Sequence, residues 1–320
     1  MKIGVLKEVK DNEKRVAITP TLIPKLKKLG YEIYVESNSG LGSNFHDKQY
    51  SDNGAVISTK EEVIECDIIL NINKPSQELV SKLSSSQTFI SFFSPATNLD
   101  MLKMCEKEKI NILSMDSVPR ISRAQKMDAL SSMANVAGSR AVIEAAHEFG
   151  RFFGGQITAA GKINPAKILI IGAGVAGLSA IGTATSLGAI VKAFDTRPEV
   201  KEQVESLGAQ FLTVNLEEDG SSSDGYAKVM SEEFIAAEMA LFKEQARDVD
   251  IIITTALIPG KEAPKLITKD MVEVMKPGSI IVDLASQQGG NCELCEKDYA
   301  RWSETHDDYN MYTDEAISTP

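Results

Sequence analysis

Residues 167–177 read KILIIGAGVAG and decide the expected fold of the second half of the chain. An apolar strand, a G-x-G-x-x-G turn and an Ala-rich helical segment at 178–187 follow one another in this region of the sequence. In such a turn Gly172 permits the tight bend, Gly174 lets the backbone approach a pyrophosphate, and Gly177 lets the helix pack on the strand. The free amides and the dipole at the helix N-terminus attract the anion. The order of strand, turn and helix therefore predicts a dinucleotide site.

A second apolar run, at 190–194, predicts the neighbouring strand and ends at Asp195. Asp195 comes 18 positions after Gly177 (195 − 177), close to the spacing expected of the acid that binds the adenosine ribose. A carboxylate there accepts hydrogen bonds from a 2′-hydroxyl and repels a 2′-phosphate, so the sequence favours NAD over NADP. Arg197 weakens this preference slightly. The alternative is that Asp195 is only a turn residue at the end of a strand.

Strands and helices alternate along the rest of the chain, which predicts an α/β protein made of two Rossmann-like domains with parallel sheets. We expect the nucleotide site in the cleft between them, because open sheets bind ligands beyond the carboxyl ends of their strands. Apolar runs for further strands occur at 3–6, 33–35, 68–72, 89–93, 110–115, 251–255 and 279–284. The expected divisions are an N-terminal Rossmann-like domain at 1–125, a connecting helix at 126–150, an NAD-binding Rossmann domain at 151–293 and a divergent tail at 294–320.

Small residues recur along the expected connecting helix. Ala134, Ala137, Gly138 and Ala141 are three or four positions apart and give the helix one smooth face. A face of this kind permits close packing of two helix backbones. We therefore expect a rigid helix between the two domains.

Composition excludes several classes of function. The chain has 320 residues, of which 43% are apolar and 25% charged, which is ordinary for a globular α/β protein of two domains. A net charge of −11 disfavours binding to nucleic acid or to anionic membranes, since both need clustered Lys and Arg. No apolar run reaches membrane-spanning length, and the N-terminus does not resemble a signal peptide. We expect a cytoplasmic protein.

The cysteines and histidines do not predict a metal site or a catalytic residue. Cys66 and Cys105 stand alone in apolar patterns typical of buried thiols. Cys292 and Cys295 form C-x-x-C, which is either half of a zinc site or a redox pair, but no second pair completes four ligands, so no metal is predicted. The histidines, His46, His147 and His306, are expected at the surface.

Polar residues gather at 120–131, just before the connecting helix, where Arg120, Gln125, Asp128 and Ser131 form a polar claw. A Gly- and Ser-rich segment at 215–226 ends in Tyr226 and is interpreted as a lid, with a surface linker as the alternative. Leu257 lies in an apolar corner after the strand at 251–255 and offers a wall for a nucleotide ring.

Taken together, segments 120–138, 172–177, 193–198, 224–228 and 254–261 resemble the NAD(H)-binding component of proton-translocating NAD(P) transhydrogenase, in the alanine dehydrogenase/transhydrogenase family. The resemblance runs from Met1 to about Glu293. It implies that NAD(H) on this component exchanges hydride directly with NADP(H) on a partner component, while a membrane proton-channel component couples the transfer to proton movement. It also implies a homodimer, held through its partners on the cytoplasmic side of the inner membrane.

The resemblance further implies roles for individual residues. Those expected around the nicotinamide and its ribose are Arg120, Ile121, Ser122, Arg123, Gln125, Asp128 and Ser131. Val175 is expected at the pyrophosphate, Asp195, Thr196 and Arg197 at the adenosine ribose, Gly225 and Tyr226 in the lid, Leu257 in the wall, and Glu238 as a further cofactor contact.

Alanine dehydrogenase is the alternative within the same family, with cations like Arg15 and Lys74 for the amino-acid carboxylate. Its chemistry exchanges protons and needs a general acid or base. That enzyme has a His just after the strand expected here at 89–93 and an Asp near the final strand. This chain has Ser94 in the first region and residues 286–288, Ser-Gln-Gln, in the second. The sequence therefore favours transhydrogenase.

A third hypothesis is a truncated NAD-binding module without turnover. Its basis is the stretch from about Leu294 to Pro320, which shows no periodic pattern and no longer follows the family.

Overall fold

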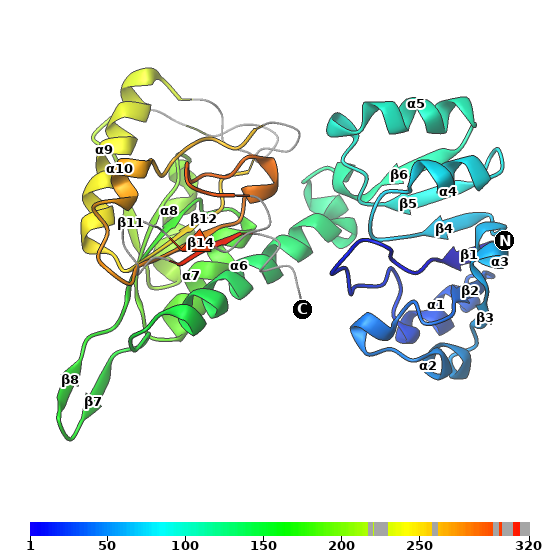
Figure 1. Cartoon of the computed structure of the whole chain (residues 1–320), viewed down its shortest axis with the longest axis horizontal. Helices are drawn as coiled ribbons and strands as arrows, with labels where there is room; N and C mark the ends of the chain where they lie inside the picture. The colour runs from blue at the N-terminus through cyan, green and yellow to red at the C-terminus, as the bar shows by residue number, and fades with distance from the viewer. Residues whose placement is uncertain (217–219, 221–229, 258–261, 297–300, 303–309, 314–320) are drawn as a thin grey trace. The chain divides into compact units, whose positions relative to one another are not determined.

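The computed structural model describes residues 1–216, 220, 230–257, 262–296, 301–302 and 310–313 (Figure 1). The chain divides into two compact units, Met1–Ala129 and Leu130–Ser318. Each unit contains a sheet of mainly parallel strands with helices, so the predicted α/β class is confirmed.

Unit 1 has a six-stranded parallel sheet in the order β3-β2-β1-β4-β5-β6. Its strands are β1 (Lys2–Val5), β2 (Glu32–Glu36), β3 (Val56–Ser58), β4 (Ile68–Leu70), β5 (Thr88–Ser91) and β6 (Asn111–Ser114). Its helices are α1 (Ile23–Lys28), α2 (Asp47–Asp52), α3 (Lys60–Ile64), α4 (Gln77–Lys82) and α5 (Leu99–Lys107). This strand order is that of a doubly wound dinucleotide-binding fold, with its topological switch between β1 and β4.

Unit 2 has a seven-stranded sheet in the order β11-β10-β9-β12-β13-β15-β14. Its strands are β9 (Lys167–Ile171), β10 (Ile190–Phe194), β11 (Gln210–Leu212), β12 (Ile251–Thr254), β13 (Ile280–Asp283), β14 (Arg301–Trp302) and β15 (Asn310–Thr313). Its helices are α6 (Ala129–Glu148), which begins one residue before the unit, α7 (Val175–Ser186), α8 (Lys201–Ser206), α9 (Glu232–Asp248) and α10 (Lys269–Val272). Only β14 pairs antiparallel among these described strands. The switch point lies between β9 and β12.

Apolar runs form the central strands of this second sheet. Strands β9, β12 and β13 are buried almost completely because helices or loops cover both of their faces. Continuous Ile and Val, rather than alternating polarity, is the pattern expected of such strands.

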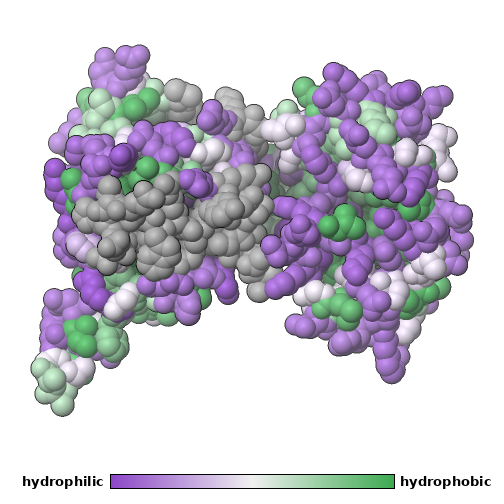
Figure 2. All heavy atoms as spheres, viewed as in Figure 1, coloured by the Kyte–Doolittle hydropathy of each residue, from purple (hydrophilic) through white to green (hydrophobic). Residues whose placement is uncertain are grey.

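A β-hairpin of β7 (Gln156–Thr158) and β8 (Gly161–Ile163) extends away from the sheet of unit 2 (Figure 1). Ile157 at its centre is 91% exposed. Elsewhere, on the face shown in Figure 2, the described surface is mostly hydrophilic and apolar residues are scattered among polar ones. Single exposed apolar residues of this kind are normal on a protein surface.

Two helices differ in extent from the sequence expectation, and two strands were not expected. Helix α7 begins at Val175 rather than at 178, because Gly174 takes an extended conformation and acts as the N-cap. Helix α6 occupies Ala129–Glu148, whereas the sequence predicted 126–150. After Leu294, where no regular pattern was evident, β15 pairs in parallel with β13 and β14 pairs with β15.

Two helical glycines give a matched test of packing within unit 2. A Cβ on Gly138 of α6 would lie 2.0 Å from the carbonyl oxygen of Ala176 on α7, whereas one on Gly182 would meet its nearest atom, of Leu207, at 3.8 Å. Gly138→Ala should therefore lower the free energy of unfolding by roughly 1–3 kcal/mol through overpacking. Gly182→Ala should be neutral or raise it by about 0.5–1 kcal/mol, because alanine favours the helix. Denaturant unfolding measures both, and equal effects would contradict the close contact of α6 with α7.

Candidate functional site

The glycine-rich turn after β9 forms an open cradle at the N-terminus of α7. Gly172 has φ +99°, and a Cβ there would lie 2.4 Å from Oγ1 of Thr255. A Cβ on Gly177 would lie 1.8 Å from the carbonyl oxygen of Gly172, so α7 reaches β9 only because this residue has no side chain. A Cβ on Gly174, by contrast, would meet its nearest atom, Nη2 of Arg197, at 4.0 Å. The three glycines thus serve two purposes, close packing at Gly172 and Gly177 and open space at Gly174.

The carboxylate of Asp195 connects this turn to the end of β10. Its Oδ2 accepts a hydrogen bond from the N–H of Ala173 at 2.7 Å. Arg197 donates from its backbone N–H, from Nε and from Nη2, each at 2.9 Å. These bonds raise the pKa of the guanidinium of Arg197 and fix both side chains, which are 6% and 15% exposed. The guanidinium is thereby oriented toward Asp195.

Two buried polar groups lie near Asp195. One is Oγ1 of Thr196, the residue after Asp195, which has no hydrogen-bond partner among the described residues. The other is the carboxyl of Glu238 on α9, which is 6% exposed. Burial first, and then the negative charge of Asp195, raise the pKa of Glu238 to about 7. Unpaired buried polar groups are costly and often belong to a ligand site.

The segment after β12 borders the same turn. Oγ1 of Thr255 lies 3.2 Å from the carbonyl oxygen of Gly172 and donates to it. Leu257, two residues further, is 37% exposed. The sequence analysis predicted Leu257 as a site residue but did not predict Thr255, because a threonine at a strand end has no distinctive pattern.

The polar claw crosses the boundary between the two units. Residues 122–127 form a 3₁₀ helix in unit 1, Asp128 ends it, and Ser131 lies in the first turn of α6 in unit 2. Arg120, Ile121, Ser122, Arg123 and Gln125 are exposed, while Asp128 and Ser131 are half-buried. Gly225 and Tyr226, predicted in the lid, lie outside the described residues.

The cations proposed for a carboxylate substrate are engaged within unit 1. Arg15 donates from Nε and Nη2 to the carboxylate of Glu13 at 2.8 and 2.6 Å. Lys74 donates to the side-chain oxygen of Asn98. Ser94 follows β5 with a positive φ of 51°, and its N–H donates to Asp116 at 2.8 Å. Serine there offers no general base near neutral pH.

Cys292 and Cys295 follow β13 as free thiols. Burial raises the pKa of Cys292 to about 12 and raises that of Cys295 strongly. Thiolate is the form that binds metals and attacks disulfides, so both cysteines are poorly suited to either role.

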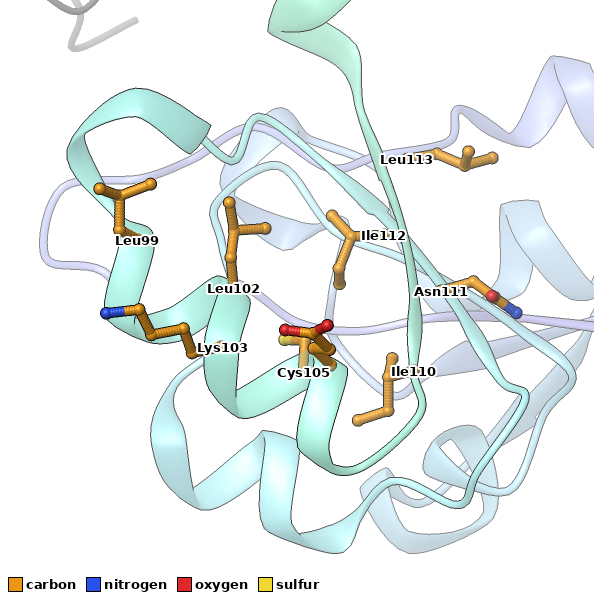
Figure 3. Close-up of a pocket in the computed structure, with 9 residues that line it drawn as sticks. Leu99, Leu102, Lys103, Cys105, Ile110, Asn111, Ile112 and Leu113 are labelled. Carbon is orange, nitrogen blue, oxygen red and sulfur yellow. The ribbon is translucent and has the colours of Figure 1, made fainter.

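A pocket of 630 Å³ lies elsewhere, between α5 and the edge strand β6 of unit 1 (Figure 3). Figure 3 shows Leu102 and Ile112 turned toward the space between these two elements. Its lining is mainly apolar and contains none of the predicted site residues.

Known proteins resemble this chain throughout its length. A model of the alanine dehydrogenase/PNT N-terminal domain matches residues 4–137, and one of the C-terminal domain matches residues 141–313. The chain belongs to the alanine dehydrogenase/PNT family. The C-terminal match extends past Glu293, where the resemblance was expected to end.

Relatives from both branches of the alanine dehydrogenase/PNT family are similar to the chain. NAD(P) transhydrogenase subunit alpha of Haemophilus influenzae is 58% identical over 296 residues, which are 92% of this chain and 58% of that protein. The subunit alpha of Cereibacter sphaeroides is 54% identical, covering 93% of this chain and 58% of that protein. An alanine dehydrogenase of Staphylococcus epidermidis is 30% identical, covering 93% and 75%. The chain thus spans only 58% of the length of these two alpha subunits.

Solved structures of the alanine dehydrogenase/PNT family share the fold. The transhydrogenase of Sinorhizobium meliloti matches with a TM-score of 0.88 and 38% identity, over 100% of this chain and 89% of that chain. An L-alanine dehydrogenase matches with a TM-score of 0.80 at 23% identity, over 100% and 84%. Within the residues that the structure describes, no helix is both long and apolar enough to cross a membrane.

Glu238 gives a pH-dependent prediction. Its pKa is about 7 in the folded chain and ordinarily 4.5, so between these values the folded state keeps a proton that the unfolded state releases. The free energy of unfolding therefore falls as pH rises from about 4.5 to 7 and then levels off. Glu238→Gln, which stays neutral, should gain roughly 2–3 kcal/mol relative to the parent between pH 5 and 8.

Thermal or denaturant unfolding at several pH values measures this gain. Glu233→Gln is the control, because Glu233 is exposed on the same helix. A difference between Glu238→Gln and the parent that stays constant with pH, or a gain of the same size in Glu233→Gln, would contradict the role of Glu238 burial.

Proposed function

We propose that this chain is the NAD(H)-binding component of an NAD(P) transhydrogenase and that hydride passes directly between NAD(H) bound here and NADP(H) on a partner component. The observation that carries the proposal is the 58% and 54% identity to transhydrogenase alpha subunits. Ser94 after β5 and residues 286–288 after β13, where alanine dehydrogenase needs its catalytic His and Asp, support the same choice.

The described residues fit a dinucleotide. Gly174 leaves room for a pyrophosphate at the N-terminus of α7, next to Val175, which is exposed. Oγ1 of Thr196 is a buried polar atom that a ribose hydroxyl or water would satisfy. The buried carboxyl of Glu238, whose pKa is raised partly by Asp195, is a further candidate contact. The guanidinium of Arg197 donates hydrogen bonds to Asp195 and is therefore less able to bind a 2′-phosphate. This arrangement favours NAD over NADP.

Positioning accounts for catalysis in this proposal. Bound NADH supplies the hydride. Hydride transfer between two nicotinamides exchanges no proton at the reacting carbons, so the chain needs no acid or base and its residues act by orienting the ring. Arg120, Gln125, Asp128 and Ser131 are proposed to hold the nicotinamide and its ribose, Ile121, Ser122 and Arg123 to contact the cofactor, Leu257 to form a wall, and Gly225 with Tyr226 to cover the site.

The proposed partners are an NADP-binding component, a membrane component that moves protons, and a second copy of this chain. The name "subunit alpha" of the relatives supports partnership with other subunits. We propose location on the cytoplasmic side of the inner membrane through these partners. The proposed division of the chain remains 1–125, 126–150, 151–293 and 294–320.

The decisive assay mixes the purified chain with an NADP-binding component and follows reduction of an NAD analogue by NADH in the presence of NADP(H). Turnover supports the proposal, whereas NADH binding without turnover would support the hypothesis of a truncated NAD-binding module. Incubation with alanine and NAD tests the rival, and rapid pyruvate formation would establish alanine dehydrogenase instead.

A pair of glycine variants tests the nucleotide cradle. Gly174→Ala adds a methyl group in open space, so stability should stay within about 0.5 kcal/mol of the parent while NADH binds at least tenfold more weakly. Gly177→Ala drives a methyl group into the carbonyl of Gly172 and should destabilise unit 2 by roughly 3 kcal/mol or more. Fluorescence titration with NADH and denaturant unfolding separate the two effects. Tight NADH binding by Gly174→Ala would place the pyrophosphate elsewhere.

Gln125→Asn tests the claw. Shortening the side chain should slow hydride transfer about 10–100-fold, because misplacement of a reacting ring is costly, while the NADH dissociation constant changes less than threefold. Gln77→Asn, an exposed glutamine of unit 1 outside the claw, is the control and should change neither quantity. Single-turnover kinetics and NADH titration give the two values. Equal losses in rate and affinity would mean that Gln125 only binds.

A further inference from the structure

Asn291 is a buried side chain that binds the backbone at two places, Ala256 and Pro264. It is 0% exposed. Its Oδ1 accepts a hydrogen bond from the N–H of Ala256 at 3.1 Å, and its Nδ2 donates to the carbonyl oxygens of Ala256 and Pro264, both at 2.9 Å. The side chain therefore holds the chain just before Leu257 and again at Pro264.

The backbone around Asn291 is itself fixed to the sheet of unit 2. The carbonyl oxygen of Asn291 accepts hydrogen bonds from Leu266 and Ile267 at 2.8 and 3.0 Å. The next residue, Cys292, donates its N–H to the carboxylate of Asp283, at the end of β13, at 2.9 Å. Hydrogen bonds of Asn291 and Cys292 thus connect the end of β13 to the segment after β12.

The segment that Asn291 holds touches the nucleotide cradle on one side. Thr255 donates its N–H to the carbonyl oxygen of Ile171 at 2.9 Å, and its hydroxyl to that of Gly172 at 3.2 Å. On the other side the segment carries Leu257, which is partly exposed although apolar. Ala256 lies between these two residues, and it is the residue whose N–H and carbonyl are both bound by Asn291.

We propose that Asn291 is a positioning residue of the nucleotide site, which sets the distance between the Leu257 side chain and the glycine-rich turn. This inference rests on the proposed function, since it requires that the turn binds NAD(H). Removal of the amide leaves three backbone groups without their partner, and the segment 255–257 then shifts or moves. The nucleotide loses its wall even though the sheet remains intact.

Asp250 supplies a matched control at the opposite end of the same strand. It is also buried and immediately precedes β12, where its carboxylate accepts hydrogen bonds from the N–H of Lys167, from Arg151 and from Lys276 at 2.7–3.0 Å. Burial alone would raise the pKa of Asp250, but these bonds outweigh it and lower the pKa. Asp250→Asn therefore weakens buried polar interactions at the start of β12, at the end of the strand away from the glycine-rich turn.

The experiment compares Asn291→Ala, Asp250→Asn and the parent chain by NADH titration, under conditions where all three are folded. The expected result is a dissociation constant raised at least tenfold in Asn291→Ala and less than twofold in Asp250→Asn. Equal losses in both variants would mean that Asn291 supports stability only, which overturns the inference. A parent chain that does not bind NADH would instead contradict the proposed function.

Hydrogen exchange of the parent chain tests the same inference if Asn291→Ala does not fold. Saturating NADH should slow amide exchange in the peptide that contains Ala256 and Leu257 at least fivefold, because the nucleotide packs on the segment that Asn291 holds. Unchanged exchange there, with NADH bound, would show that the segment does not contact the nucleotide and would overturn the inference.

Discussion

The close approach of Gly177 to the carbonyl oxygen of Gly172 is the constraint on which the rest of unit 2 depends. It brings the N-terminus of α7 onto the end of β9, with no room for a Cβ at 1.8 Å. Helix α6 then packs on α7 through Gly138, where a Cβ would lie 2.0 Å from Ala176. The absence of side chains at Gly177 and Gly138 thus allows α7 to pack on β9 and α6 to pack on α7. The open space at Gly174 follows from this arrangement, because α7 begins immediately after it.

Hydrogen bonds carry this geometry to the neighbouring loops. The carboxylate of Asp195 binds the N–H of Ala173 in the glycine-rich turn, and the hydroxyl of Thr255 binds the carbonyl of Gly172 from the other side. The turn is therefore held between the ends of β10 and β12, the two strands that flank β9. Hydrogen bonds that fix the turn in this way would reduce the entropy lost if a nucleotide binds there.

Local patterns predicted strands β1, β2, β4, β5, β6, β9, β10, β12 and β13 and the glycine-rich turn, because strand periodicity and glycine spacing act over a few residues. The three-residue strands β3, β7, β8 and β11 were not predicted, because each is too short to show a pattern. Strands β9 and β10 end where the apolar runs end. The sequence did not reveal Asn291 or Thr255 as partners of the site, because their contacts lie 35 and 83 positions away along the chain. Strands β14 and β15 were missed for a related reason: β15 is an extension of a sheet already formed, so pairing with β13 compensates for a weak pattern of its own. The polar claw at 120–131 was evident from its residue types, but the roles of its residues were predicted from the resemblance alone, since they form no periodic pattern.

Glu238 has a consequence for the energetics of ligand binding. Burial raises the pKa of this carboxyl to about 7, into the range where its protonation responds to changes near neutral pH. Any group that binds beside it and changes its pKa must release or take up a fraction of a proton. The heat of binding would then depend on the buffer that accepts or supplies this proton. The affinity for a ligand that binds beside Glu238 would then depend on the proton concentration.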